Sequence, residues 1–114
     1  ITKFDTLMAI QSSTRKEQGK LRIANHPNPF HMSTQISYYL EHDSRVLVEV
    51  YNVQGRKIAT LNDRHENQGE HSVRWDGFGS DGQMVASGMY YYRVNIKADN
   101  QPDINKINSM LLVK

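Results

Sequence analysis

Apolar and polar residues alternate along the chain from Lys20 onward, and turn-forming residues interrupt the alternation roughly every ten positions, as in antiparallel sheets. Successive side chains of a strand point to opposite sides, so a period of two marks strands with one buried face. Helical periodicity is nearly absent from this part of the sequence. The pattern therefore predicts an all-β fold, an antiparallel β-sandwich of about seven strands.

The clearest alternating segments define the expected strands. These are 34–40, 46–51, 57–61, 71–75, 89–96 and 106–113. The strongest signal is in 89–96, where Tyr90, Tyr92, Val94 and Ile96 share one face. The last segment ends in a nearly continuous apolar run, so we expect a closing strand covered on both faces.

Glycine and proline mark the connections between these strands. Gly55 supplies the positive φ that the tight turn 53–56 needs. The corner 27–29 contains two prolines, which no central strand could contain. We expect loops at 62–69, 76–87 and 99–103.

Residues 1–19 do not fit the sandwich pattern, because their apolar residues recur at a spacing of three before a polar stretch. We expect them to be a linker or the tail of an upstream region. Residues 20–114 should form one sandwich domain, since one core usually serves about 100 to 150 residues. The sequence begins with Ile1 rather than methionine, so we expect it to be an excised or processed piece of a longer protein.

Composition limits the partners that the protein can have. The chain has no cysteine, which excludes disulfides and thiolate metal sites. Its 14 basic and 12 acidic residues are scattered and give a net charge of +2, so no basic patch predicts binding to nucleic acid. The sequence has no run of about 20 apolar residues, and we expect no membrane span.

The sequence Gly77-Phe78-Gly79-Ser80-Asp81-Gly82 matches the G-x-G-x-x-G spacing of dinucleotide-binding loops. Such a loop binds pyrophosphate because its last glycine opens a helix. Here a tyrosine-rich strand follows instead. We interpret the motif as a glycine-rich turn.

Three oxygen-bearing residues of the same loop, Asp76, Ser80 and Asp81, are candidate ligands for a hard cation such as calcium. Their spacing departs from an EF-hand, which needs a glutamate at the twelfth position and a helix on each side. The favoured interpretation is that the two aspartates accept hydrogen bonds from loop amides in Asx-turns. We therefore expect no cofactor, with calcium as the alternative.

The sequence contains no recognisable catalytic arrangement. Its five histidines include no HExxH pair, and no G-x-S-x-G nucleophile elbow occurs. A transition metal held by His26 and His31 at the corner is a weaker alternative to surface histidines. Short connections between strands leave little room for a cleft. We expect a protein that is not an enzyme.

Six motifs, in order along the chain, carry a family resemblance. They are Asn25-His26-Pro27-Asn28-Pro29-Phe30, Ser33-Thr34-Gln35-Ile36-Ser37-Tyr38, Val50-Tyr51-Asn52-Val53-Gln54-Gly55-Arg56, His71-Ser72-Val73-Arg74-Trp75-Asp76-Gly77, Ala86-Ser87-Gly88-Met89-Tyr90-Tyr91-Tyr92-Arg93 and Met110-Leu111-Leu112-Val113-Lys114. From about Leu21 to its end, the chain resembles the type A C-terminal sorting domains of bacterial type IX secretion cargo. It is equally similar to the immunoglobulin-like domain of the flagellar hook-capping protein. The resemblance implies an immunoglobulin-like β-sandwich, and the departure at His31-Met32, where many relatives have Asn-Pro, should not alter it.

The resemblance also implies a sorting and attachment role. The folded domain would be read by the outer-membrane secretion machinery, and a surface protease would then cut before it and join the cargo to a surface lipid. This places the protein in the secreted or cell-surface fraction, by way of the periplasm and outer membrane. The residues expected to be recognised are Gly55, Arg56, Gly88, Tyr90, Tyr92, Arg93 and Lys114.

Three other functions remain open at this point. The first is a self-associating structural subunit or interaction module of an extracellular assembly, in which Ile1–Ile10 adds a strand to the open edge of a neighbour. The second is a hook-capping-like scaffold. The third is a carbohydrate-binding module with an exposed tyrosine face around Tyr91.

Overall fold

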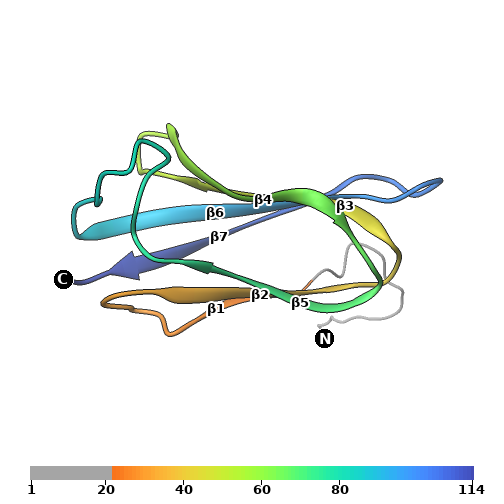
Figure 1. Ribbon diagram of the computed structural model, residues 1–114, viewed down its shortest axis with the longest axis horizontal. Helices are drawn as coiled ribbons and strands as arrows, with labels where there is room; N and C mark the ends of the chain where they lie inside the picture. Colours follow the sequence, from red (N-terminus) through yellow and green to blue (C-terminus); the bar gives the residue numbers. More distant parts are fainter. Residues whose placement is uncertain (1–21) are drawn as a thin grey trace, which may run out of the picture.

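The computed structural model describes residues 22–114, which form two antiparallel sheets packed face to face (Figure 1). One sheet has the strand order β1-β2-β5 and the other β4-β3-β6-β7. The strands are β1 (Ile23–His26), β2 (Thr34–Leu40), β3 (Ser44–Tyr51), β4 (Lys57–Glu66), β5 (Gly69–Trp75), β6 (Gly88–Lys97) and β7 (Ile104–Leu112). The prediction of an all-β antiparallel sandwich of about seven strands is confirmed.

The predicted linker 1–19 and the predicted strand addition by Ile1–Ile10 lie outside the described residues. Within the described part of the chain, there is no helix that could cross a lipid bilayer.

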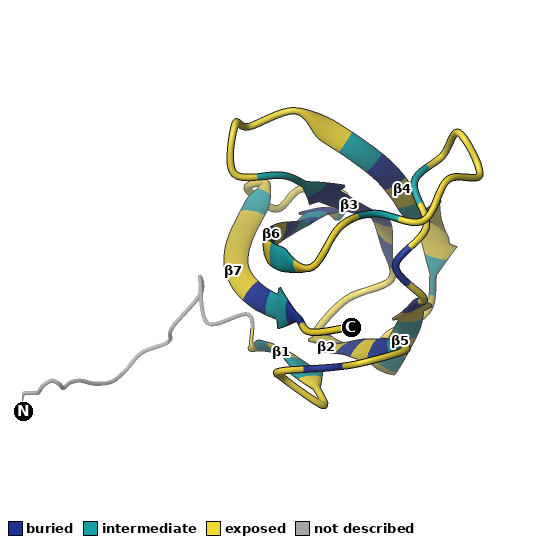
Figure 2. Ribbon diagram, turned by 90° about the vertical axis from the view of Figure 1, so that its left-hand side faces the viewer, coloured by how far each residue is buried: buried dark blue, intermediate teal, exposed yellow. Residues whose placement is uncertain are grey.

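Alternating side chains of the facing strands build the core between the sheets (Figure 2). β2 buries Thr34, Ile36, Tyr38 and Leu40 and exposes the residues between them. β6 buries its even-numbered residues from 90 to 96 in the same way. Because a slip of one residue would turn all these side chains toward solvent, the alternation fixes the register of the strands.

Trp75 lies at the centre of an aromatic cluster in the core. Its ring centroid is 5.7 Å from that of Phe30 and 5.3 Å from that of Tyr90. Its indole Nε1 donates a hydrogen bond to the carbonyl oxygen of Phe78 at 3.0 Å. A buried indole needs such a partner, so Trp75 stabilises both the core and the loop that follows it.

β4 is longer than the sequence suggested. The prediction of a loop over 62–69 is wrong, because residues 62–66 continue β4 and pair with residues 44–48 of β3. Only Asn67 and Gln68 lie between β4 and β5. This end of β4 lies at the edge of its sheet and is largely exposed, so it carries polar side chains and no apolar alternation.

The last strand, β7, differs from its prediction in burial. It pairs with β6 along its whole length but lies at the edge of the four-stranded sheet. Residues 105–109 are exposed, and only Met110 and Leu112 are buried. The expectation of a strand covered on both faces is therefore wrong, because the apolar run 110–113 is only the buried end of an edge strand.

The connections sort to the two ends of the sandwich (Figure 1). One end, which we call the loop end, is formed by the corner 27–33, the turn 52–56, the loop 76–87 and the C-terminal residues 113–114. The opposite end carries the start of β1 and the turns 41–43, 67–68 and 98–103. Figure 2 is viewed from the loop end.

Candidate functional site

The loop end brings together residues that the sequence singled out from three distant segments. Gly55 and Arg56 lie in the turn 52–56, Gly88 begins β6, and Lys114 ends the chain. The backbone N–H of Lys114 donates to Ser87 Oγ at 3.0 Å, which holds the C-terminus beside the start of β6. Gly55, Arg56 and Lys114 are all exposed, so they are accessible to a partner.

The turn 52–56 is stabilised by Asn52, which sequence reasoning missed. Asn52 Oδ1 accepts hydrogen bonds from the backbone N–H groups of Gln54 at 2.9 Å and Arg56 at 3.0 Å. Gly55 has φ of 83°, as predicted for this turn. An asparagine that bonds the backbone two residues on is typical of an Asx-turn, so the Asn-x-x-Gly spacing was the signal for it. The turn presents Arg56 on a well-defined backbone.

Tyr90 and Tyr92 lie at the same end of β6, but their side chains point into the core. Tyr90 is 7% exposed and Tyr92 is fully buried. The Tyr90 hydroxyl donates to the carbonyl oxygen of Ala86 at 2.6 Å, and that of Tyr92 donates to Asn25 Oδ1 at 3.2 Å. Burial raises the pKa of both tyrosines. Their side chains therefore stabilise the fold and are not accessible to a partner of the folded domain.

Arg93 lies on the outer face of the four-stranded sheet and forms an ion pair with Glu49, which sequence reasoning also missed. Its Nη2 donates to Glu49 Oε1 at 2.7 Å. Tyr51 Oη donates to the same carboxylate at 2.9 Å, and Lys57 Nζ lies 3.3 Å from it. Burial raises the pKa of Glu49, but the hydrogen bonds from these three residues together outweigh it, so this pKa lies below its usual value. The charged Glu49 fixes the position of the Arg93 guanidinium.

A shallow hollow of about 340 Å³ joins Arg93 to the turn 52–56. Tyr91 lines it together with Val53, Gly55 and Ile107. Val53 is 66% exposed and Ile107 is 61% exposed. Two of the predicted recognition residues, Gly55 and Arg93, thus share one apolar surface patch.

The loop 76–87 contains the two Asx-turns that the sequence favoured. Asp76 Oδ1 accepts from the N–H of Phe78 at 3.3 Å, and Asp81 Oδ1 accepts from the N–H of Gln83 at 2.9 Å. Phe78 and Met84 form an isolated antiparallel bridge. The interpretation of this segment as a glycine-rich turn is confirmed, because the loop folds back on itself and leads into β6.

The calcium alternative for Asp76, Ser80 and Asp81 stays a prediction. Ser80 is fixed in the loop by its N–H, which donates to the carbonyl oxygen of Ile58 at 2.8 Å. Within residues 22–114, no three His, Cys, Asp or Glu side chains lie close enough together to hold a metal ion. His31, proposed as a metal ligand at the corner, has its Nδ1 2.7 Å from the carbonyl oxygen of Val113.

The corner 27–33 holds the end of β7, a contact that no local pattern in the sequence indicates. Phe30 N–H donates to the carbonyl oxygen of Leu111, and Phe30 accepts from Val113 N–H, both at 2.9 Å. Asn28 Oδ1 accepts from Leu111 N–H at 3.0 Å. We call Asn28, Phe30 and His31 the corner clamp, because together they tie the first sheet to the last strand of the second.

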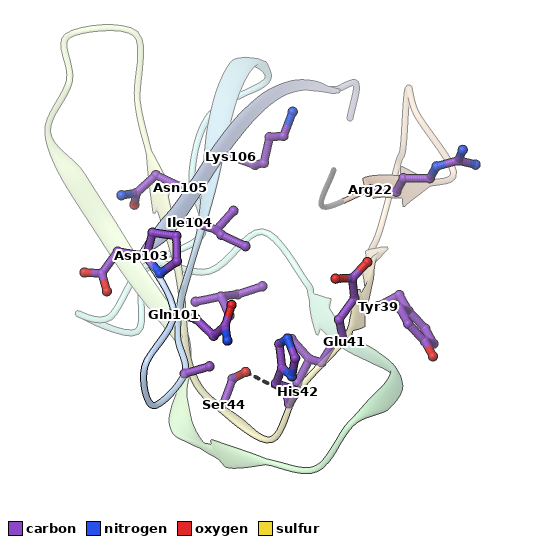
Figure 3. A pocket seen from close by; sticks show the side chains of 14 residues that line it. Arg22, Tyr39, Glu41, His42, Ser44, Gln101, Asp103, Ile104, Asn105 and Lys106 are labelled. Atoms are coloured by element: carbon purple, nitrogen blue, oxygen red, sulfur yellow. Dashed lines mark hydrogen bonds between the residues drawn. The ribbon is translucent and has the colours of Figure 1, made fainter. Parts of the chain in front are cut away.

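A larger cleft of about 910 Å³ lies at the end opposite the loop end (Figure 3). Its side chains come from both sheets and from the turns 41–43 and 98–103, with Tyr39, Glu41 and His42 on one side and Asp103 and Asn105 on the other. A single hydrogen bond joins labelled residues, from Ser44 Oγ to the carbonyl oxygen of His42 at 2.6 Å. None of the residues expected to be recognised lines this cleft.

Comparisons with known proteins agree with this architecture. Residues 30–100 match the family described as FlgD Ig-like domain. No curated protein matches the chain in sequence.

Two solved structures share its fold. Dimeric latent PorU from Porphyromonas gingivalis superposes with a TM-score of 0.68 and 20% identity; the match covers 82% of this chain but only 9% of PorU. FlgD from P. aeruginosa superposes with a TM-score of 0.57 and 20% identity, covering 84% of this chain and 76% of that one. These similarities establish an immunoglobulin-like β-sandwich.

Proposed function

Because the chain belongs to the family of FlgD immunoglobulin-like domains, we propose that it is a non-catalytic sorting and attachment domain. In this proposal it directs an exported protein through type IX secretion to the cell surface. The outer-membrane secretion machinery reads the loop end, and a surface protease cuts the chain before the sandwich. No cofactor takes part.

The observation that carries the proposal is the position of the loop end relative to the start of β1. Gly55, Arg56 and Lys114 are exposed at one end of the sandwich, and the chain enters β1 at the other (Figure 1). The long axis of the domain measures 43 Å. A cargo joined before β1 therefore leaves the loop end free for a receptor, which is the arrangement that a sorting label needs.

Two further observations support the same function. The six motifs that resemble type IX sorting domains include the turn 52–56 and the C-terminal strand, and both contribute to the loop end. PorU, a type IX secretion protein, contains a stretch with the same fold.

A fusion of this chain behind a periplasmic reporter with an ordinary export signal tests the proposal. The reporter is followed in a host with an intact type IX machine and in one that lacks it. We expect surface delivery only in the first host. A reporter that stays in the periplasm of both hosts would contradict the proposal.

A charge reversal within the same fusion tests the loop end itself. We expect Arg56→Glu to reduce delivery, whereas Lys97→Glu, at an exposed residue that ends β6 at the opposite end of the sandwich, should leave it unchanged. Equal delivery by the two variants would show that Arg56 does not belong to the recognised surface.

The family match also supports a second candidate, a hook-capping-like scaffold. The match covers 76% of the solved FlgD chain, so most of that chain is similar in fold to this domain. Binding of the purified chain to assembled flagellar hooks, together with failure of the secretion assay, would favour the scaffold.

A further inference from the structure

The outer face of the four-stranded sheet has two halves that differ in how their charges are paired. In the half away from the loop end, Arg45 and Lys97 lie opposite each other in the register of β3 and β6. Each has an exposed carboxylate beside it: Arg45 pairs with Asp63 and Lys97 with Asp103, and the four side chains are 51 to 62% exposed. The charges of this half therefore cancel at the surface.

The half beside the loop end has a different arrangement. Two cations, Arg93 and Lys57, share the single carboxylate of Glu49. The side chain of Glu49 is only 7% exposed, whereas those of Arg93 and Lys57 are 36% and 52% exposed. The negative charge thus lies beneath two cationic groups, and one positive charge is left without compensation at the surface.

Arg93 also keeps hydrogen-bond donors free. A guanidinium has five N–H donors, and Glu49 accepts from Nη2 at 2.7 Å. The Nε of Arg93 is buried and has no hydrogen-bond partner within residues 22–114. Because the rest of the guanidinium stays partly exposed, its remaining donors are available to a second carboxylate, the acceptor with which arginine forms its strongest bonds.

Apolar side chains surround this positive charge. The hollow of about 340 Å³ beside Arg93 is lined by Val53, Tyr91 and Ile107. The guanidinium carbon of Arg93 lies 5.9 Å from the centre of the Tyr51 ring, which lines the same hollow. In an extended chain, residues two apart point to the same side and lie about 6 to 7 Å from each other. One extended segment can therefore place an apolar side chain in the hollow and a carboxylate at Arg93.

We propose that the hollow binds an extended segment of a partner protein, with an apolar side chain in the hollow and, two residues away, a carboxylate at Arg93 and Lys57. The proposal deepens the function proposed above, because Gly55 and Arg93 are among the residues expected to be recognised. It rests on that function in assigning the segment to the secretion machinery.

Two other occupants fit the charges of this face less well. A second copy of the chain would bring the same positive face against this one, and like charges repel each other. A nucleic acid presents a row of phosphates and needs several cations along it. Here one uncompensated positive charge lies beside an apolar hollow, which matches a single carboxylate next to an apolar side chain.

Two capped ten-residue peptides test this chemistry on the full chain. One has a central Leu-Ser-Asp and the other a central Leu-Ser-Asn, both flanked by glycine and serine, so that they differ only in charge. In NMR titrations the aspartate peptide should shift the amide signals of Tyr91, Arg93 and Ile107. It should bind at least about fivefold more tightly than the asparagine peptide. Equal binding of the two peptides, or shifts confined to another surface, would overturn the proposal.

Matched variants show whether the apolar and the charged parts of the site act together. Ile107→Asp places a carboxylate of the chain itself in the hollow and should abolish the preference for the aspartate peptide, whereas Ile107→Leu should keep it. Lys57→Gln should reduce the preference, and Lys97→Gln, in the half where the charges cancel, should not. Circular dichroism checks that each variant is folded. A preference that survives both Ile107→Asp and Lys57→Gln would contradict the proposed site.

Delivery of the reporter fusion separates this inference from the function on which it rests. Where the intact type IX machine delivers the fusion, we expect Ile107→Asp to reduce delivery about tenfold and Ile107→Leu to leave it unchanged. Equal delivery of these two variants would overturn the inference and leave the sorting function standing. A fusion that is not delivered at all contradicts the sorting function, and the peptide titration then decides the inference by itself.

Discussion

The two long sides of the sandwich close in different ways. On the β4–β5 side the chain itself connects the sheets, because only two residues separate the strands. There Tyr38 donates to Glu66 at 2.6 Å, and its ring stacks on that of His71. On the β1–β7 side the strands lie at opposite ends of the sequence, and the hydrogen bonds between the sheets join residues 67 to 85 positions apart.

The comparison shows where the fold depends on specific side chains. Because the β4–β5 connection is short, forming that contact costs little conformational entropy. Bringing β1 and β7 together closes a loop that contains most of the chain, and contacts between residues far apart in sequence must offset the larger loss of entropy. The corner clamp and the hydrogen bonds from Tyr92 to Asn25 and from Asn108 to the carbonyl oxygen of Ile23 supply these contacts. We therefore expect substitutions on the β1–β7 side to cost more stability.

The largest effect should come from Phe30→Ala. Phe30 is fully buried and contributes both to the corner clamp and to the aromatic cluster around Trp75. Loss of a buried phenylalanine costs about 3 to 5 kcal/mol, which urea unfolding would measure. Phe78→Ala, at a residue that is 39% exposed, should cost much less. Similar losses for both variants would show that the corner has no special role.

Asn28→Ala should have the next largest effect. It removes the acceptor for Leu111 N–H and the donor for the Ser109 carbonyl, at about 1 kcal/mol for such hydrogen bonds. Hydrogen exchange at the Leu111 amide should become faster. Asn105→Ala removes one exposed side-chain bond on the same strand, to Asn95, and should leave that amide protected.

Tyr38→Phe should cost somewhat less than Asn28→Ala, although its hydrogen bond is shorter. The hairpin still holds β4 beside β5, and Arg64 Nε remains 3.4 Å from the carboxylate of Glu66. We expect a loss of roughly 0.5 to 1 kcal/mol in the free energy of unfolding. A larger loss than for Asn28→Ala would contradict the proposed difference between the two sides.

The smallest effect at neutral pH concerns tyrosine ionisation. Burial, and after it the hydrogen bond to Glu66, raises the pKa of Tyr38, and burial raises that of Tyr92. Both folded-state pKa values lie above the ordinary value of about 10, so this contribution to stability is complete below pH 10 and falls as the pH rises further. Unfolding free energies measured from pH 9 to 12 should decline, and less steeply in Tyr38→Phe.

The sequence predicted the strands whose two faces differ in polarity. β2 and β6 could be predicted well because each has one buried apolar face, and the turn at Gly55 could be predicted from its need for positive φ. The second half of β4 and the exposure of β7 could not, because an edge strand is defined by its neighbours and not by its own pattern.

The candidate site was predictable only in part. Gly55, Arg56 and Lys114 come from separate segments, and nothing local to them shows that they share one end of the sandwich. Tyr90 and Tyr92 were expected among the recognised residues because the family resemblance implied the whole segment 88–93. Their burial depends on which face of β6 meets Trp75. Asn28 could be assigned to the corner but not to its distant partner, Leu111.

The opposite placement of the start of β1 and the end of β7 also determines how the domain would respond to mechanical force. Both strands run in the same direction along the sandwich, and the bridge between Phe30 and Leu112 is parallel. A pull on Ile23 and Lys114 would therefore act along the strands and load the hydrogen bonds between β7, β6 and the corner clamp all at once, in shear. We expect such a domain to resist tension better than one unzipped from a single end, a useful property in the attachment role that we propose.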